Sequence, residues 1–130
     1  MAGFTIKNLK EIDDAAPKFG FAPNLEARFV GDQLDSENAG ISYQRLAPGF
    51  RIPFGHKHKT QEEMYVVVSG SGRIKLDDEV REVKQWDVVR VGNGTTRNLE
   101  AGPEGLELIA IGAPGPKLDD AEMTQDWWTD

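Results

Sequence analysis

The chain has 130 residues, a formal net charge of −7 and no cysteine, so it is long enough to bury a core without disulfides or a structural metal. Its acidic balance opposes binding to nucleic acid, because the basic residues form no long stripe that would offset it. No apolar stretch reaches transmembrane length, and the start of the chain carries charge where a secretory signal needs an apolar run. We therefore expect a cytoplasmic protein without membrane contact.

Short runs of β-branched and aromatic residues, separated by glycine, proline or acidic turns, fill most of the chain. Before them, residues 1–26 form an extension in which Ile6, Leu9 and Ile12 are spaced three apart, as in a short turn of helix. Strands are expected over residues 27–34, 41–47, 64–69, 72–76, 80–83, 87–91, 96–100 and 106–111. Such spacing is typical of a sandwich or barrel, so the predicted fold class is all-β.

Three polar or glycine-rich stretches separate these strands. Residues 77–79 are acidic and favour a hairpin turn over an acidic catalytic cluster. Residues 70–72 and 92–94 each contain two glycines and also lie between predicted strands. Neither opens a helix or precedes a Gly-Lys-Ser/Thr sequence, so we do not expect a phosphate-binding loop.

After the last predicted strand, the sequence Gly-Ala-Pro-Gly-Pro ends the sheet pattern. Asp119 or Asp120 is placed to cap a final helix that runs to Trp128. Met123 and Trp127 would share one face of this helix, where they would pack against the barrel or against a second subunit.

Both histidines of the chain, His56 and His58, lie in one short stretch that is followed by Glu63. Imidazoles at i and i+2 lie on the same side of an extended strand, and a carboxylate on the next strand can converge with them. This geometry predicts a metal site. The alternative is that Lys57 and Lys59 make the stretch a solvated basic turn.

The residues around the histidines follow one spaced pattern, which comprises Pro48, Gly49, His56, His58, Glu63 and Gly70. This pattern resembles the first sequence motif of the cupins, and the resemblance covers roughly residues 40–112. It implies a double-stranded β-helix, a jelly-roll barrel in which two histidines and a glutamate bind a divalent metal and a histidine of a second motif completes the site. We therefore expect one cupin domain over residues 1–130, with a barrel core at about 27–112 and a C-terminal tail or helix over 113–130.

The second motif departs from the family pattern. Asp87 and Gly94 hold their places, but Gly92 stands where proline would, and Arg97 occupies the position of the fourth metal ligand. A guanidinium has no lone pair to offer at accessible pH, so Arg97 cannot be that ligand.

Two arrangements follow from a fixed positive charge beside His56, His58 and Glu63. In the first, these three residues hold Fe(II), Mn(II), Ni(II) or Zn(II), and Arg97 points past the metal to bind an anionic group of the substrate. In the second, Arg97 pairs bidentately with Glu63 and takes the place of the cation, so that no metal binds.

Other side chains near Glu63 are candidates for the same site. Tyr65 has the parity of Glu63 and is expected to line the cavity and contact substrate, the alternative being a core aromatic whose hydroxyl is bonded to the backbone. Gln61 and Glu62 are candidate replacement ligands, although Glu62 should point away from Glu63 if both are on the strand.

Three functions follow from these residues. The first is a metalloenzyme of oxygenase or isomerase type that acts on a small polar or anionic molecule, with Arg97 as the substrate anchor. The second is a module that binds or senses a small acid without metal, and the third is metal-free acid-base catalysis by Glu63 or a histidine. Exposed edge strands and the tryptophans near residue 128 also predict a homodimer.

Overall fold

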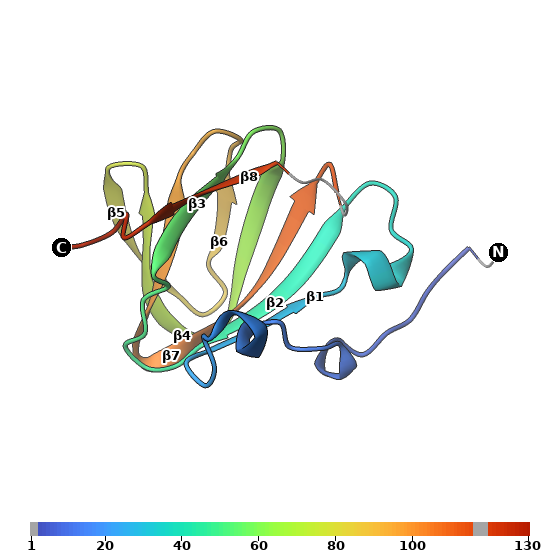
Figure 1. Ribbon diagram of the computed structural model, residues 1–130, viewed down its shortest axis with the longest axis horizontal. Helices are drawn as coiled ribbons and strands as arrows, with labels where there is room; N and C mark the ends of the chain where they lie inside the picture. The colour runs from blue at the N-terminus through green and yellow to red at the C-terminus, as the bar shows by residue number, and fades with distance from the viewer. Residues whose placement is uncertain (1–2, 116–119) are drawn as a thin grey trace.

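The computed structural model describes residues 3–115 and 120–130 and consists mainly of one curled antiparallel β-sheet (Figure 1). Its strands are β1 (Leu25–Phe29), β2 (Gly40–Leu46), β3 (Phe54–His58), β4 (Glu62–Leu76), β5 (Glu79–Lys84), β6 (Val88–Val91), β7 (Arg97–Ala113) and β8 (Ala121–Gln125). Three short 3-10 helices accompany them: η1 (Leu9–Glu11), η2 (Ala16–Phe19) and η3 (Gly31–Leu34). None of the helices in the described ranges has the length and apolar character needed to span a membrane.

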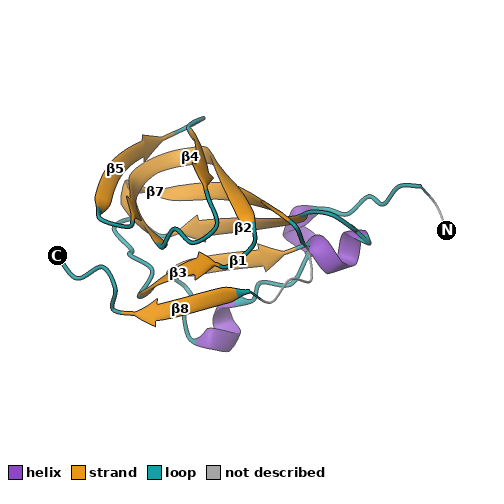
Figure 2. Cartoon of the chain, turned by 90° about the horizontal axis from the view of Figure 1, so that it is seen from above, coloured by secondary structure: helices purple, strands orange, loops and turns teal. Residues whose placement is uncertain are grey.

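The two longest strands, β4 and β7, form the centre of the sheet. They pair antiparallel along almost their whole length, from Glu62 opposite Ala113 to Leu76 opposite Arg97. β7 also pairs with β2 and β3, while β4 also pairs with β5 and β6. Figure 2 shows the sheet curling so that β3 and β8 lie opposite β4 and β5. This curl brings the beginning of β4 and the beginning of β7 toward β3.

Each long strand joins two strands that were expected to be separate: residues 64–69 and 72–76 in β4, and residues 96–100 and 106–111 in β7. The glycines between them allow a bend rather than a break. Gly70 has a φ of 80°, and a Cβ atom there would lie 2.1 Å from the carbonyl oxygen of Gly105. The ladder shifts register on both sides of Gly70. A bulge of this kind turns a strand without ending it, so the glycines mark a corner of the barrel. The turn expected at residues 77–79 is confirmed between β4 and β5, where it comprises residues 77 and 78. Residues 92–94 lie between β6 and β7, as expected.

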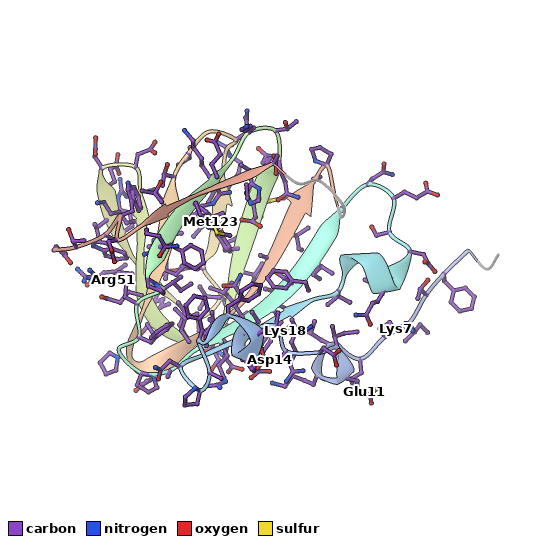
Figure 3. All side chains as sticks on the ribbon, viewed as in Figure 1. Lys7, Glu11, Asp14, Lys18, Arg51 and Met123 are labelled. Carbon is purple, nitrogen blue, oxygen red and sulfur yellow. The ribbon has the colours of Figure 1, made fainter. Side chains whose placement is uncertain are left out.

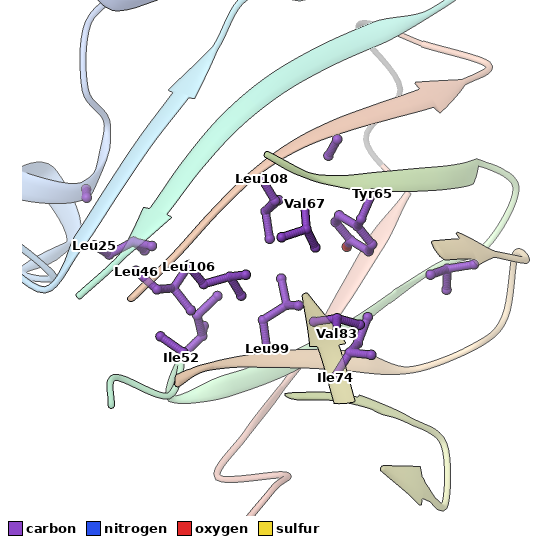
Figure 4. Close-up of a cluster of buried hydrophobic side chains, with 14 residues drawn as sticks. Leu25, Leu46, Ile52, Tyr65, Val67, Ile74, Val83, Leu99, Leu106 and Leu108 are labelled. Atoms are coloured by element: carbon purple, nitrogen blue, oxygen red, sulfur yellow. The ribbon is translucent and has the colours of Figure 1, made fainter. Parts of the chain in front are cut away.

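Apolar side chains fill the interior of the barrel (Figure 4). Val67 faces Leu108 and Leu46 faces Leu106 across the ladders, so their side chains lie on one face. Burial of each such side chain stabilises the fold by about 1.5–3 kcal/mol. Tyr65 lies beside Val67 and Leu108 in Figure 4, at the limit of this core. Glu63, the inward-facing residue that precedes Tyr65 on β4, lies among other polar side chains that line a cavity.

The N-terminal extension lies outside the sheet, as expected. Between Ile6 and Ile12, only Leu9–Glu11 forms a helical turn, and Ile6 remains exposed, so this helical segment is shorter than the spacing predicted. Ile12 is buried. The extension packs against the outward-facing side of β1, where its Lys10 ammonium lies 2.7 Å from Glu26 Oε2.

The predicted C-terminal helix is wrong. In its place, β8 pairs antiparallel with β3, with Ala121 opposite His58 and Met123 opposite His56. An edge strand carries N–H and C=O groups that need partners, and an added strand supplies them where a helix lying beside it would not. Asp120 therefore caps no helix, and Asp119 lies outside the described residues.

The two tryptophans pack on their own barrel. The ring of Trp128 is buried, with the guanidinium carbons of Arg51 at 4.1 Å and Arg73 at 5.1 Å from its centroid. The ammonium of Lys75 lies 4.5 Å from the centroid of Trp127. These cation–π contacts attach the end of the chain to the sheet. Association into a homodimer stays a prediction.

Candidate metal centre

The three predicted metal ligands converge at one point of the barrel. His56 and His58 lie on β3, and their ring centroids are 5.2 Å apart with perpendicular planes. Glu63 Oε1, on β4, lies 3.9 Å from His56 Nε2 and 3.8 Å from His58 Nε2. Lys57, between the histidines, instead pairs with Glu122 at 3.5 Å. The stretch is therefore a strand with both imidazoles on one side, and not a solvated turn.

The donor atoms suit a first-row transition metal. All lie within 4.8 Å of one another. Metal–nitrogen and metal–oxygen bonds of about 2.0–2.2 Å would require neighbouring donors about 3–3.5 Å apart, so small side-chain rotations would bring them to bonding positions. Two imidazoles and one carboxylate, with further coordination positions open, are a donor set that Fe(II), Mn(II), Ni(II) and Zn(II) accept.

Arg97 lies behind the carboxylate of Glu63. It is the first residue of β7, pairs with His56 across the ladder, and has 0% of its surface exposed. Its Nη2 lies 3.4 Å from Glu63 Oε1, while its Nη1 donates to the carbonyl of Thr95 at 2.9 Å. The buried Nε has no hydrogen-bond partner among the described residues. The guanidinium thus touches Glu63 through one nitrogen rather than bidentately.

Tyr65 also contacts this carboxylate. Its hydroxyl donates to Glu63 Oε1 at 2.7 Å, whereas the alternative considered from sequence was a bond to the backbone. Burial would raise the pKa of Glu63, but the His56 imidazole, the Tyr65 hydroxyl and the Arg97 charge outweigh it and hold that pKa below its ordinary value. Burial and the Glu63 charge raise the pKa of Tyr65 well above its ordinary value. Glu63 is therefore ionised at neutral pH and Tyr65 stays a donor.

The two candidate replacement ligands do not join the donor set. Glu62 points away from Glu63, as its parity predicted, and pairs with the exposed Arg90 at 3.0 Å. Gln61 lies at the cavity wall, where its amide nitrogen donates to the carbonyl of Pro114 at 2.9 Å.

Sequence reasoning missed Asp120 as a member of the site. Its Oδ1 lies 2.8 Å from His58 Nδ1, although 62 positions separate the two residues. Burial would raise the pKa of Asp120, but hydrogen bonds from the Gln61 N–H, His58 and the Thr60 N–H lower it to about 2. No local pattern indicates this contact, because it depends on the pairing of β8 with β3.

A cavity of about 390 Å³ opens onto these groups. Its polar side chains are those of His56, His58, Glu63, Tyr65, Arg97, Ser42, Gln44, Gln61 and Asn98. Its apolar wall includes Leu25, Ala27, Phe29, Ile41, Ile52, Phe54, Leu99, Ala110, Ala121 and Met123. Met123, labelled in Figure 3, projects from β8 and is 64% exposed, which places it at the mouth. The cavity thus combines the polar candidate ligands with a largely apolar lining.

Comparison with known proteins identifies the family to which this barrel belongs. A family model described as the cupin domain matches residues 42–112, more than half of the chain. This chain is a cupin. The matched segment holds the three predicted ligands as well as Tyr65 and Arg97. Asp120 lies beyond the matched segment.

Similar proteins support the same fold. Uncharacterized protein MJ1618 of Methanocaldococcus jannaschii is 32% identical over 71 residues, which are 54% of this chain and 57% of that protein. A Klebsiella pneumoniae protein with a double-stranded β-helix domain has a TM-score of 0.71 at 18% identity, over 92% of this cupin and 96% of that chain. An oxalate decarboxylase variant from Bacillus subtilis has a TM-score of 0.70 at 25% identity, over 85% of this cupin but 30% of that chain. The predicted all-β cupin fold is thereby confirmed, apart from the C-terminal helix.

Proposed function

We propose that this cupin binds Fe(II), Mn(II), Ni(II) or Zn(II) through His56, His58 and Glu63 and acts as an oxygenase or isomerase on a small polar or anionic molecule in the barrel. The observation that carries this proposal is the convergence of three donor atoms from two strands within 4.8 Å of one another. When bound there, a divalent ion would polarise a carbonyl or carboxylate oxygen, or activate water or O₂.

The charges around the site are compatible with a divalent cation despite Arg97. The pKa values of Glu63 and Asp120 are both lowered, so both carboxylates are ionised at neutral pH. Counted with the fixed positive charge of the Arg97 guanidinium, these two carboxylates contribute one net negative charge to the site. A single nitrogen at 3.4 Å also leaves Glu63 incompletely paired. A fully paired carboxylate would be a poor ligand, and this one is not fully paired.

The volume and the lining of the cavity support a small ligand with an anionic or polar group and an apolar body. Arg97 has no exposed surface, so we assign its contribution chiefly to its positive charge beneath Glu63. Tyr65 would hold Glu63 in position through its hydroxyl. The Bacillus subtilis neighbour is named for a small dicarboxylate, oxalate, which agrees with an anionic ligand.

The test of the metal site is elemental analysis of purified, untagged protein. We expect near-stoichiometric transition metal in the wild type and in K57A, and none in H58A. Lys57 is a matched control because it lies between the histidines but pairs outward with Glu122. Wild-type protein that carries no metal and takes up none from added Fe(II), Mn(II), Ni(II) or Zn(II) would contradict the proposal.

A second function, binding of a small acid without metal, is favoured by one observation: the contact of Arg97 with Glu63. It predicts that chelator-treated protein is stabilised by small carboxylic acids, as measured by thermal denaturation, and that H58A keeps this response. The metalloenzyme predicts that chelation removes both activity and ligand response. Metal-free catalysis with Glu63 as the base is disfavoured, because a carboxylate with a lowered pKa is a weak base at neutral pH.

A further inference from the structure

Asp120 is held in place at several points where the chain enters β8. Its Oδ2 accepts hydrogen bonds from the backbone N–H groups of Thr60 at 2.8 Å and Gln61 at 2.9 Å. Its backbone carbonyl accepts from the N–H of Lys59 at 3.2 Å. The residue is 8% exposed. With Oδ2 committed to the backbone, Oδ1 is directed at a single partner, Nδ1 of His58 at 2.8 Å.

The chemistry of this contact determines which imidazole nitrogen carries a proton. An ionised carboxylate only accepts hydrogen bonds, so Nδ1 of a neutral His58 must be the protonated nitrogen. The lone pair is then on Nε2, the nitrogen that faces Glu63 Oε1 at 3.8 Å. A hydrogen bond of this kind to the distal nitrogen fixes both the orientation and the basicity of a ligating histidine.

The position of Asp120 depends on the C-terminal segment. β8 pairs with β3 so that Ala121, the residue after Asp120, lies opposite His58. Beyond β8, Trp128 is buried against Arg51 and Arg73. The C-terminal segment therefore contacts the candidate ligand His58 through the carboxylate of Asp120.

We propose that Asp120 is a positioning residue that holds His58 in the Nδ1–H form, so that Nε2 is free to bind a metal. Its negative charge also offsets the positive charge of Arg97, which stands in the position of the fourth metal ligand. The part of the inference that concerns metal affinity rests on the proposed function, whereas the state of His58 does not.

D120N tests this proposal sharply. The two backbone N–H groups need an oxygen acceptor, so the single amide oxygen of asparagine would take the place of Oδ2. Its Nδ2 would then face His58 and donate to Nδ1, which would force the proton to Nε2 and remove the lone pair needed for metal. The matched control is E122Q, which removes one negative charge two residues further along and, among the described residues, affects the pairs with Lys57 and Lys59.

The tautomer of His58 is read by long-range ¹H–¹⁵N NMR of metal-free protein at pH 8, and affinity is read by titration with Zn²⁺ against a competing chelator. We expect the Nδ1–H form in wild type and E122Q, and the Nε2–H form in D120N. We also expect Zn²⁺ to bind D120N about 10–100-fold more weakly, and E122Q within about twofold of wild type. D120A serves as a second variant, with loss of the fixed Nδ1–H signal expected and circular dichroism to check folding.

The outcomes separate the two proposals. A wild-type His58 in the Nε2–H form, or folded D120N with unchanged Zn²⁺ affinity and an unchanged tautomer, would overturn the role of Asp120. If the wild type binds no Zn²⁺ but its His58 has the Nδ1–H form, and D120N loses that form, only the metal site would be overturned. The orientation of His58 by Asp120 would then be supported.

Discussion

Two partly buried glutamates, Glu26 on the outer face of the barrel and Glu63 inside it, lie beside arginine and have lowered pKa values. Glu26 Oε2 lies 2.7 Å from Lys10 Nζ and 2.6 Å from Arg28 Nε. Its Oε1 lies 3.1 Å from Arg45 Nε. Glu63 has one arginine nitrogen nearby, at 3.4 Å, and its polar contacts within the described residues all share Oε1.

The difference separates a carboxylate that is fully paired within the fold from one that is left available to a ligand. Glu26 has a cation on each oxygen and joins the N-terminal extension to β1 and β2, so it has little capacity left for a ligand. Glu63 keeps an oxygen without a partner among the described residues and faces two imidazole nitrogens across the cavity. Incomplete pairing of a buried carboxylate is unfavourable for stability and useful for binding.

The largest difference in metal binding is expected between variants that remove the charge of Glu63 and of Glu26. E63Q should weaken metal binding by more than about 100-fold, because loss of a direct ligand exceeds the 10–100-fold effect of removing an outer partner. E26Q should leave metal content unchanged. Metal analysis of both purified variants checks this prediction. Equal metal loss in E26Q would show that the outer carboxylate also supports the site.

E26Q should instead destabilise the fold. The pKa of Glu26 falls from 4.5 to about 2 because hydrogen bonds from its three cationic partners outweigh burial, which acts to raise it. Taken in full, this pKa shift would contribute about 3 kcal/mol to the free energy of unfolding. Because Lys10 is exposed and screened by solvent, we expect a contribution of about 1–3 kcal/mol. Because the pKa of Glu26 is lower in the folded protein, ionised Glu26 stabilises the fold at pH values above its pKa in the unfolded chain. This stabilisation is lost as the pH falls toward the pKa of Glu26 in the folded protein.

Urea unfolding of wild type and E26Q between pH 7 and pH 2.5 measures this contribution. The difference in free energy of unfolding should be constant above about pH 5 and shrink steadily between pH 4.5 and pH 2.5. A difference that is independent of pH would mean that packing, rather than the ionised carboxylate, accounts for the loss.

A smaller effect is expected when Arg97 is exchanged for the residue of the family pattern. R97H removes a positive charge beside Glu63 and offers a fourth ligand, an imidazole nitrogen, so metal affinity should rise about tenfold or more. R90H is the matched control, because Arg90 is exposed and pairs with Glu62 rather than Glu63. Zn²⁺ titration of folded protein measures the change, and weaker binding in R97H would show that the guanidinium supports the metal site.

The smallest effect should come from Glu62, the sequence neighbour of Glu63. Its pair with Arg90 is exposed, so E62Q should change the free energy of unfolding by less than about 0.5–1 kcal/mol and leave metal content unchanged. Thermal unfolding and metal analysis check both expectations. Loss of metal in E62Q would mean that the two carboxylates exchange roles in solution.

The sequence by itself determined the all-β class and the inner site at β3 and β4. Residues at i and i+2 share a face of any strand, so His56 and His58 were paired without knowledge of the fold. The parity of β4 likewise placed Glu63 and Tyr65 inward and Glu62 outward. These inferences held because side-chain alternation is a local property of extended backbone.

Only the tertiary structure decided how the C-terminal segment and Arg97 contribute. The pattern after Asp120 was compatible with a helix, but the free edge of β3 made it a strand and brought Asp120 to His58. The glycines at 70 and 72 likewise resembled loop signals until the pairing of β4 with β7 showed a bend. Whether Arg97 pairs fully or partly with Glu63 depends on distances between strands far apart in sequence, which no local pattern contains.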